Sequence, residues 1–348
     1  MTPRQADVIV IGAGVSGLTT AVCLADAGYS VRVRATRLPP ETTSCSAGAL
    51  WGPYLVADER VLSWCQETRR VMEGLAGEET GIRITAGIEA AKTTVDPPAW
   101  AHLLDGFAIC GPDELPDGYV TGWRYTAPVV DMPAYLDYLT RRLLETGRGT
   151  VEVGQVESLA EAAAWSGIAV NCTGYGARHL VPDPEVTPVR GQLLVVDNPG
   201  IERFFAEAEV EIEGADPTEL TYIFPQGDHV VLGGTAVTGR HDVTDDPTAA
   251  AGILRRCAAV EPALAGARIR AGRAGIRPSR PRVRVERVEV ERAYLIHNYG
   301  HGGSGVTLSW GCAAEVLRLV REIATEPGPV PNAAPGPDGG AVVTRPNR

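Results

Sequence analysis

Apolar and polar positions in the first 35 residues follow the order strand, helix, strand. DVIVIG at 7–12 is a continuous apolar run, which is typical of a strand buried on both faces. SGLTTAVCLADAG at 16–28 has apolar residues at helical spacing and ends in glycine. In YSVRVR at 29–34, apolar and polar residues alternate, which is typical of a strand. This order predicts a β-α-β unit with two parallel strands.

Later segments mix helical and strand patterns. Apolar residues recur at helical spacing over 66–80 and over 133–146, where Pro133 marks a helix start. Strand patterns follow at 167–173, 189–196, 221–226, 229–236 and 282–288. Turn residues separate the three strand segments between 189 and 236, and this arrangement is typical of an antiparallel sheet. The stretch from Ala324 is rich in Pro, Gly and Ala, so we expect a disordered tail over 324–348.

Length, charge and cysteine content narrow the class of protein. A chain of 348 residues, 44% of them apolar, exceeds the size of one growing core and predicts two lobes. The formal net charge of −11 argues against a nucleic-acid partner. Seven scattered cysteines without C-x-x-C or zinc-like spacing indicate reduced thiols and no metal. Without a secretion signal or a membrane-length apolar run, we expect a cytoplasmic protein with no membrane partner.

A dinucleotide motif follows the first strand. Gly12, Gly14 and Gly17 form G-x-G-x-x-G where a strand turns into a helix, the context in which this pattern binds a pyrophosphate. The acidic residue that would bind a ribose after the second strand is absent, because residues 34–37 read Arg-Ala-Thr-Arg. Arg34 or Arg37 could meet a 2′-phosphate or an adenine, or could simply be solvated at the strand end.

A second glycine cluster lies near the other end of the chain. Residues 300–305, GHGGSG, hold four glycines between a strand-like run and a helical segment. One glycine would suffice for an ordinary strand-to-helix turn, so four favour close approach of a flat ligand to the main chain. Two glycine loops at opposite ends of the chain favour a flavin over a nicotinamide, because flavin proteins bring a C-terminal segment back beneath the isoalloxazine. We therefore expect FAD as the cofactor.

Eight segments, in order, resemble the FAD-dependent D-amino acid oxidase family, which includes the D-aspartate oxidases, over residues 6–322. They are VIVIGAGVSGLTTA, RLPPETTSCSAGALWGPY, VVDMPAYLDYL, VNCTGYGA, VRGQLLVV, TYIFPQ, IRPSRPRVRVE and IHNYGHGGSGVTLSWGCA. The resemblance implies an α/β fold in which a Rossmann-type FAD-binding domain is interleaved with an antiparallel-sheet substrate domain, like that of p-hydroxybenzoate hydroxylase. The FAD domain is expected mainly at 1–50, 131–182 and 288–323, and the substrate domain mainly at 51–130 and 183–287.

The resemblance also implies which residues contact FAD. Thr42, Thr43 and Ser44 are expected at its phosphates or ribityl chain, and Thr307 near the pyrimidine edge of the flavin. Arg37 followed by Leu38 matches the family, whereas Thr36 stands where some relatives have an acidic residue. The expected cofactor residues are Gly12, Gly14, Val15, Ser16, Gly17, Arg37, Thr42, Thr43, Ser44, Gly48, Ala49, Leu50, Gly302, Gly303, Ser304, Gly305, Val306 and Thr307.

A planar guanidinium binds a substrate carboxylate best, through two parallel hydrogen bonds. The family match assigns this role to Arg277, although most of its neighbours must be solvated arginines: Arg273, Arg280, Arg282, Arg284 and Arg287. Tyr222 matches the tyrosine that shares the carboxylate; from its own pattern it would be a half-buried strand residue. A carbonyl in the 302–305 loop, assigned to Gly303, is expected to accept the substrate ammonium, with Gly52 and Phe224 completing the pocket.

The resemblance implies oxidation of a D-amino acid. Hydride passes from Cα to flavin N5, O₂ becomes H₂O₂, and the imino acid hydrolyses to a 2-oxo acid and ammonia, as in D-amino acid catabolism. No acid or base side chain is needed if the amine is neutral, so His297 and His301 are expected to be structural or cofactor-side groups. Asn298 and Tyr299 are expected behind them.

Other activities on the same fold stay open. They include glycine, sarcosine, D-aspartate and biosynthetic amine oxidation; a flavin-binding protein without turnover is a different class. The segment 202–219 carries seven carboxylates, either as a solvated loop or as a flank of the entrance that disfavours acidic substrates. By the resemblance, Gly52 stands where some relatives have a glutamine. The lid tyrosine that mammalian members have a few residues ahead of Tyr222 has no counterpart here, and Thr218 is the nearest position in the sequence. A homodimer is also expected as a possible assembly.

Overall fold

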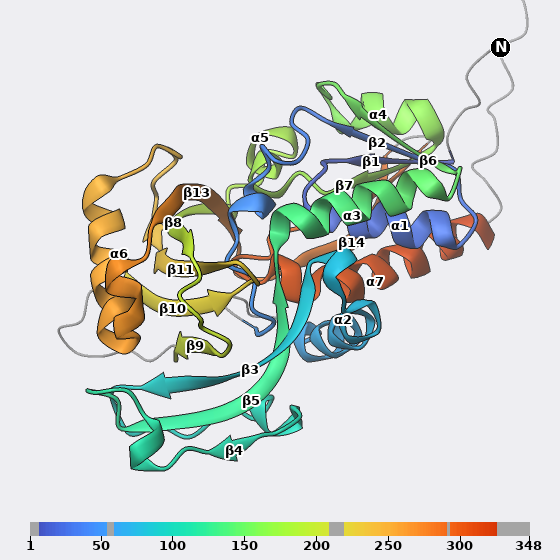
Figure 1. The fold of residues 1–348 in the computed structure, drawn as a ribbon. Coiled ribbons are helices and arrows are strands. Elements are labelled where there is room, and N and C mark those ends of the chain that lie inside the picture. Colours follow the sequence, from blue (N-terminus) through green and yellow to red (C-terminus); the bar gives the residue numbers. More distant parts are fainter. Residues whose placement is uncertain (1–6, 54–58, 209–218, 291–292, 326–348) are drawn as a thin grey trace, which may run out of the picture.

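The computed structural model describes residues 7–53, 59–208, 219–290 and 293–325, which fold around two β-sheets (Figure 1). The first sheet has six strands in the order β14-β15-β7-β1-β2-β6. All neighbours are parallel except β14 and β15. The strands are β1 (Val8–Ile11), β2 (Val31–Ala35), β6 (Gly149–Val153), β7 (Ile168–Asn171), β14 (Arg284–Val290) and β15 (Ala293–Tyr299).

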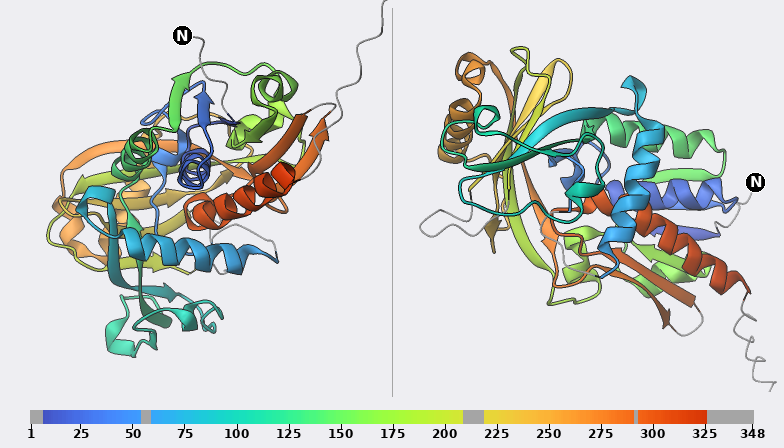
Figure 2. Two further views of the ribbon diagram at one scale, coloured as in Figure 1. Left: turned by 90° about the vertical axis from the view of Figure 1, so that its right-hand side faces the viewer. Right: turned by 90° about the horizontal axis from the view of Figure 1, so that it is seen from below.

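Helices cover both faces of the six-stranded sheet, as a parallel sheet requires. On one face lie α1 (Val15–Asp26), α3 (Met132–Glu145) and α7 (Gly305–Thr325); α4 (Leu159–Ser166) lies on the other (Figure 1). A further helix, α2 (Val61–Leu75), runs alongside α7 (Figure 2). All four residues of β1 are buried, so its apolar run is explained by burial on both faces.

The second sheet has nine strands in the order β12-β8-β11-β10-β9-β3-β5-β4, with β13 paired to β8. It is antiparallel except where β3 meets β9. Helix α6 (Pro247–Val260) covers its outer face (Figure 1). The strands are β3 (Ile82–Ala91), β4 (Ala108–Ile109), β5 (Thr121–Val130), β8 (Thr187–Asp197), β9 (Phe204–Glu207), β10 (Glu219–Pro225), β11 (His229–Thr235), β12 (Val237–Thr238) and β13 (Ile269–Ser279).

The interleaved α/β architecture predicted from the sequence is confirmed. The chain crosses between the sheets repeatedly, so strands from the first, middle and last thirds form the six-stranded sheet. The expected helix at 66–80 is instead α2 plus a short 3₁₀ turn at Glu78–Thr80. Beyond the end of α2, the Thr80 hydroxyl donates to the carbonyls of Leu75 and Gly77, which closes the turn into the 3₁₀ segment.

Two features near the ends of segments also differ from expectation. Helix α7 runs to Thr325, so the first two residues of the expected tail are helical, and the rest lies outside the described residues. Ten residues of the acidic segment, 209–218, lie outside them as well, including the position of Thr218. In the described part of the chain, no helix combines the length and apolarity needed to cross a membrane.

Candidate active site

A cavity of about 1130 Å³ lies between the two sheets. Its loop side is lined by the segments that follow strands of the six-stranded sheet (11–16, 34–37, 154–157 and 172–176), together with 41–44, 46–50, 301–303 and 305–307. Its sheet side is lined by residues of β3, β5, β9, β10 and β13. The volume exceeds the usual range for one drug-sized ligand, so the cavity has room for a dinucleotide and a substrate together.

The N-terminal glycine motif shapes the loop side by close backbone approach. Gly12 has φ +110°, and a Cβ there would lie 2.5 Å from the carbonyl oxygen of Cys172. A Cβ on Gly17 would lie 1.9 Å from the carbonyl oxygen of Gly12, so α1 packs directly on β1. Gly14, the N-cap of α1, has no side chain to cover the first turn. The positive end of the helix dipole therefore opens on the cavity, where an anion is stabilised.

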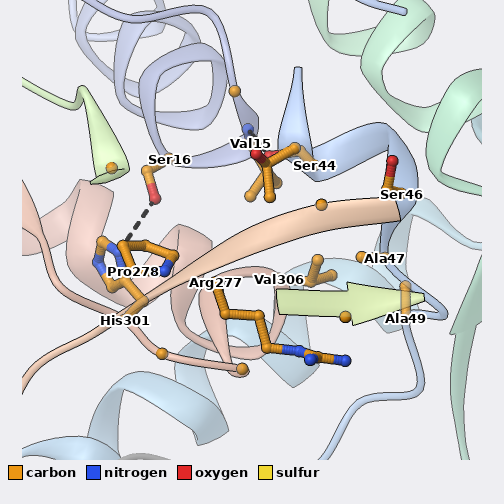
Figure 3. Close-up of a pocket in the computed structure, with 18 of the residues that line it drawn as sticks. Val15, Ser16, Ser44, Ser46, Ala47, Ala49, Arg277, Pro278, His301 and Val306 are labelled. Carbon is orange, nitrogen blue, oxygen red and sulfur yellow. Dashed lines mark hydrogen bonds between the residues drawn. The ribbon is translucent and has the colours of Figure 1, made fainter. Parts of the chain in front are cut away.

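The segment after β2 adds hydroxyl groups to the same place. Ser44 Oγ accepts a hydrogen bond from the Val15 amide at 3.0 Å, which ties this segment to the start of α1 (Figure 3). Thr42 Oγ1 is buried, yet it has no hydrogen-bond partner among the described residues. Burying a hydroxyl without a partner is costly, so an orphan that lines a cavity indicates a polar ligand. These groups fit the phosphate and ribityl region of FAD.

The two arginines after the dinucleotide motif have different surroundings. Arg34 is tied to the protein: its Nη1 lies 3.0 Å from Glu152 Oε1, and its Cζ lies 4.9 Å from the ring centroid of Trp165. Arg37 is exposed and lines the cavity. Arg37 is thus the better placed of the two for a cofactor contact.

The C-terminal glycine loop, which is far from the N-terminal motif in the sequence, forms part of the same cavity wall. Gly300 and Gly302 have φ of +82° and +56°, which favours glycine. The Gly302 amide donates to the Pro278 carbonyl at 3.0 Å, so the loop lies directly beside the end of β13. Thr307 Oγ1 donates to the Gly52 carbonyl at 2.9 Å, which joins the start of α7 to the 48–52 segment.

Arg277 enters the cavity from β13 (Figure 3). Its half-buried guanidinium donates to the Thr235 carbonyl at 2.9 Å, and no carboxylate in the described part of the chain pairs with it. A Cβ on Gly191 would lie 2.4 Å from Arg277 Nη1, so the guanidinium lies over bare backbone. A half-buried cation without a counter-charge is a site for an anion.

Tyr222 lies close to this cation. Burial raises its pKa to about 12, while the positive charge of Arg277 acts in the opposite direction. Its ring stacks on Phe224, with centroids 4.6 Å apart. A Cβ on Gly233 would lie 1.6 Å from Tyr222 Cζ, so the ring, like Arg277, depends on a neighbouring strand glycine.

The two histidines of the C-terminal segment are buried and held by neighbours. His301 lies 3.0 Å from Asn298 Oδ1 and 3.4 Å from Ser16 Oγ (Figure 3). His297 lies 3.3 Å from Asn171 and does not line the cavity. Burial lowers the pKa of each imidazole to about 4, so both are neutral at pH 7 and are weak bases. Their geometry supports the structural role expected for them.

Most of the residues expected to form the site lie together in the cavity wall. Two expected cofactor residues do not line it: Gly17 packs α1 on β1, and Ser304 is buried in the turn before α7. Tyr299 also lies away from the cavity, where its hydroxyl donates to Asp183 at 2.7 Å. The expected residues that line the cavity are Gly12, Gly14, Val15, Ser16, Arg37, Thr42, Thr43, Ser44, Gly48, Ala49, Leu50, Gly52, Tyr222, Phe224, Arg277, Gly302, Gly303, Gly305, Val306 and Thr307.

Sequence reasoning missed part of the sheet side. The wall includes Glu89 of β3, Trp123 and Tyr125 of β5, and Trp100 of the connecting loop. Of the acidic 202–219 segment, Glu207 lines the cavity and pairs with Lys92 at 2.6 Å. No local motif marks these residues. Glu89, Trp123 and Tyr125 meet because of the register between β3 and β5.

Comparison with known proteins agrees with this geometry. The family described as FAD dependent oxidoreductase matches residues 7–319. The chain is 48% identical over 315 residues to the D-amino-acid oxidase of Rubrobacter xylanophilus, covering 89% of this chain and 94% of that protein. It is 45% identical to the D-amino-acid oxidase of Streptomyces coelicolor, covering 91% and 97% of the two chains. Human D-aspartate oxidase is 35% identical, with 91% and 95% covered.

A solved structure supports the fold. Glycine oxidase from Geobacillus kaustophilus superposes with a TM-score of 0.76 at 20% identity, covering 91% of this chain and 95% of that one. The family match over residues 7–319 and the relatives at 48% and 45% identity agree with two glycine loops and an open helix N-terminus at one cavity. The chain therefore belongs to the family of FAD-dependent oxidoreductases.

Proposed function

We propose that this protein is an oxidase of D-amino acids. The observation that carries the proposal is Arg277, a half-buried guanidinium without a carboxylate partner in the described chain, in the wall of a cavity that also has the two glycine loops. A 2-amino acid supplies the missing carboxylate. The bacterial relatives named D-amino-acid oxidase, at 45% and 48% identity, support the same substrate class.

The proposed reaction relies on the chemistry that FAD would supply when bound in the cavity: acceptance of the substrate Cα hydrogen as hydride and delivery of the electrons to O₂ as H₂O₂. The protein mainly orients the substrate. Arg277 and the Tyr222 hydroxyl hold the carboxylate, and the Gly303 carbonyl accepts a hydrogen bond from the amine. Fixing these two groups leaves one enantiomer with its Cα hydrogen directed at the cofactor. The imino acid formed then hydrolyses to a 2-oxo acid and ammonia.

No side chain of the site is assigned as acid or base. His301 of the C-terminal glycine loop lines the cavity, but its pKa of about 4, lowered by burial, and its contacts with Asn298 and Ser16 favour a positioning role. The cofactor contacts are proposed for the expected residues that line the cavity. Gly17 and Ser304 are proposed to shape the two loops from behind.

An acidic substrate fits the sheet side poorly. A D-aspartate side chain would need a second cation, and Arg277 is the one Lys or Arg lining the sheet side among the described residues. Glu89 and Glu207 line the same wall. We therefore propose that neutral or basic D-amino acids are preferred over D-aspartate, although human D-aspartate oxidase is a 35% identical relative.

Anaerobic flavin bleaching tests the proposal. The purified holoprotein is mixed with a panel of D- and L-amino acids, glycine and sarcosine, and the flavin absorbance is followed before air is admitted and peroxide is measured. We expect bleaching by D-amino acids and not by their L-enantiomers. A protein that stays yellow with every amino acid would support a non-catalytic flavin protein, and bleaching by glycine or sarcosine alone would assign the neighbouring activity.

The organisation beyond the site is also proposed. Residues 1–50, 131–182 and 288–323 mainly form the cofactor domain, and 51–130 and 183–287 mainly form the substrate domain. The protein is proposed to work in the cytoplasm and to form a homodimer. Size-exclusion chromatography with light scattering tests the assembly.

A further inference from the structure

Glu89 is an unusual carboxyl group in the sheet side of the cavity. It lies on β3, half-buried, and its Oε2 accepts a hydrogen bond from the Tyr125 hydroxyl at 2.9 Å. No Lys, Arg or His in the described chain forms an ion pair with it. Glu207, which lines the same wall, is neutralised by Lys92 at 2.6 Å. Glu89 is thus a carboxyl that faces a ligand cavity without a counter-charge.

Strand register relates Glu89 to the proposed substrate anchor. Tyr222 of β10 pairs with Ala206 of β9, Ala206 pairs with Glu89 of β3, and Glu89 pairs with Trp123 of β5. Directly paired residues point to the same face of a sheet. Neighbouring strands are about 4.8 Å apart, so Tyr222 and Glu89 leave the sheet roughly 10 Å from each other on one face.

The surface between these two residues is apolar and aromatic. Phe224 stacks on Tyr222, and Ala206 lies on the strand between Tyr222 and Glu89. Beyond Glu89, Trp100 meets Tyr125 edge to face with ring centroids 5.9 Å apart. Such a wall suits an aliphatic chain whose far end carries a polar group, and aromatic faces also attract a cation.

The acid–base behaviour of Glu89 agrees with a missing cation. Burial raises its pKa to about 7, and the hydrogen bond from Tyr125 lowers it only in part. A positive group beside this carboxyl would stabilise its ionised form. The cavity offers that place to a ligand, because a substrate carboxylate at Arg277 leaves its side chain free to run along the wall.

We propose that Glu89 determines specificity by binding the cationic end of a long basic D-amino acid, such as D-arginine or D-lysine. This inference rests on the proposed function. In extended arginine, the carboxylate carbon and the guanidinium carbon are separated by six bonds, or about 7 Å. With one hydrogen bond of about 3 Å at each end the span is about 13 Å, the same order as the roughly 10 Å between the strand positions of Tyr222 and Glu89.

The test compares D-arginine with D-citrulline, which has nearly the same shape but no charge. For the wild type, kcat/KM should be higher with D-arginine. Glu89→Gln keeps the side-chain shape and should lower kcat/KM for D-arginine by about 30-fold or more, chiefly through KM, because a charged partner is lost from a shielded pair. The value for D-citrulline should stay within about threefold. Glu89→Asp keeps the charge and should recover part of the preference.

Glu78→Gln is the matched control, because it removes the same charge from a side chain that is 89% exposed on the surface. It should leave both values unchanged. FAD content and Tm of each variant are measured first, and Glu89→Asp carries the test if Glu89→Gln does not fold. Equal losses on both substrates would overturn the proposal, since Glu89 would then act on a part that the substrates share.

The remaining outcomes separate this inference from the proposed function. If the wild type oxidises neutral D-amino acids, shows no preference for D-arginine over D-citrulline and is unaffected by Glu89→Gln, Glu89 has no role in specificity while the oxidase function stands. If no D-amino acid bleaches the flavin, the oxidase function fails, and the specificity of Glu89 fails with it.

Discussion

The loop side and the sheet side of the cavity differ in the kind of chemical groups that they present to a ligand. The loop side presents main-chain groups and small side chains: Gly12 allows close packing against the Cys172 backbone, and Gly14 leaves the first turn of α1 uncovered toward the cavity. The sheet side presents large side chains from separate strands, with Tyr222, Arg277 and Glu89 directed into one space. The loop side binds through exposed main-chain groups next to glycines, whereas the sheet side binds through charged and aromatic side chains. Cofactor affinity and substrate choice can therefore change independently.

The largest expected effect comes from filling the loop side. Gly14→Leu adds a side chain where a Cβ alone would already lie 3.0 Å from Ser44 Oγ, and it covers the open helix end. We expect the FAD dissociation constant to rise by more than about a hundredfold and the protein to purify colourless. The measurement is the ratio of absorbance at the flavin band to that of the protein, followed by titration of the apoprotein with FAD.

Gly74→Leu is the control for this change. Gly74 is exposed in α2, and a Cβ there would meet nothing within 4 Å. The control should stay yellow. A Gly14→Leu protein that retained FAD at parental affinity would mean that the pyrophosphate does not approach the chain at this turn.

The next effect comes from removing charge from the sheet side. Truncating one partner of a shielded charged pair costs about 2 to 5 kcal/mol, so Arg277→Ala should lower kcat/KM for D-amino acids by about 30-fold to several thousandfold. Arg277→Lys should recover only part, because an ammonium cannot form two parallel hydrogen bonds. FAD content should be unchanged. Peroxide release measures turnover, and Arg282→Ala, at an exposed position outside the cavity, is the control. Parental kcat/KM in Arg277→Ala would place the carboxylate elsewhere.

These two changes also separate what the sequence could and could not predict. Gly12, Gly14 and Gly17 lie within six consecutive residues, and strand, turn and helix are encoded around them, so the loop side could be predicted from local patterns. Arg277 and Tyr222 needed a family resemblance, because neither differs by itself from a surface arginine or a strand tyrosine. Glu89 could not be found at all, since its partners are set by pairing across β9 and β5.

A smaller effect should follow from a strand glycine that no motif marks. A Cβ on Gly191 would lie 2.4 Å from Arg277 Nη1, and this terminal group can move aside. Gly191→Ala should therefore fold and bind FAD, yet lose about tenfold in kcat/KM, or roughly 1.4 kcal/mol, because the guanidinium is displaced. Gly266→Ala, where nothing lies within 4 Å, is the control for steady-state kinetics. Unchanged kinetics in Gly191→Ala would show that Arg277 does not need the glycine surface.

The smallest expected effect is on stability. Its dependence on pH has opposite signs at His301, on the loop side, and at Glu89, on the sheet side. Burial lowers the pKa of His301 to about 4, from its usual 6.5, and raises that of Glu89 to about 7, from its usual 4.5. Between pH 4 and 6.5 the unfolded chain binds more protons at His301 than the folded chain, so that contribution to stability is lost as pH falls. At Glu89 the folded chain binds more protons, so its contribution is complete below pH 4.5 and is lost as pH rises through 7.

Glu89→Gln isolates the response of the sheet side, because glutamine is neutral at every pH. Relative to the wild type, this variant should gain stability between pH 5 and pH 8, by about 1 kcal/mol and a few degrees in Tm, because solvent screens part of the pKa shift at a half-buried side chain. Scanning calorimetry of the FAD-saturated protein without substrate measures the Tm difference at both pH values. Glu78→Gln, at an exposed side chain, should show a difference that does not change with pH. If the difference for Glu89→Gln is also the same at pH 5 and pH 8, the carboxyl ionises in the folded chain as it does in water. Its environment would then be as wet as the surface, and the contrast between an open loop side and a shielded sheet side would not hold at this residue.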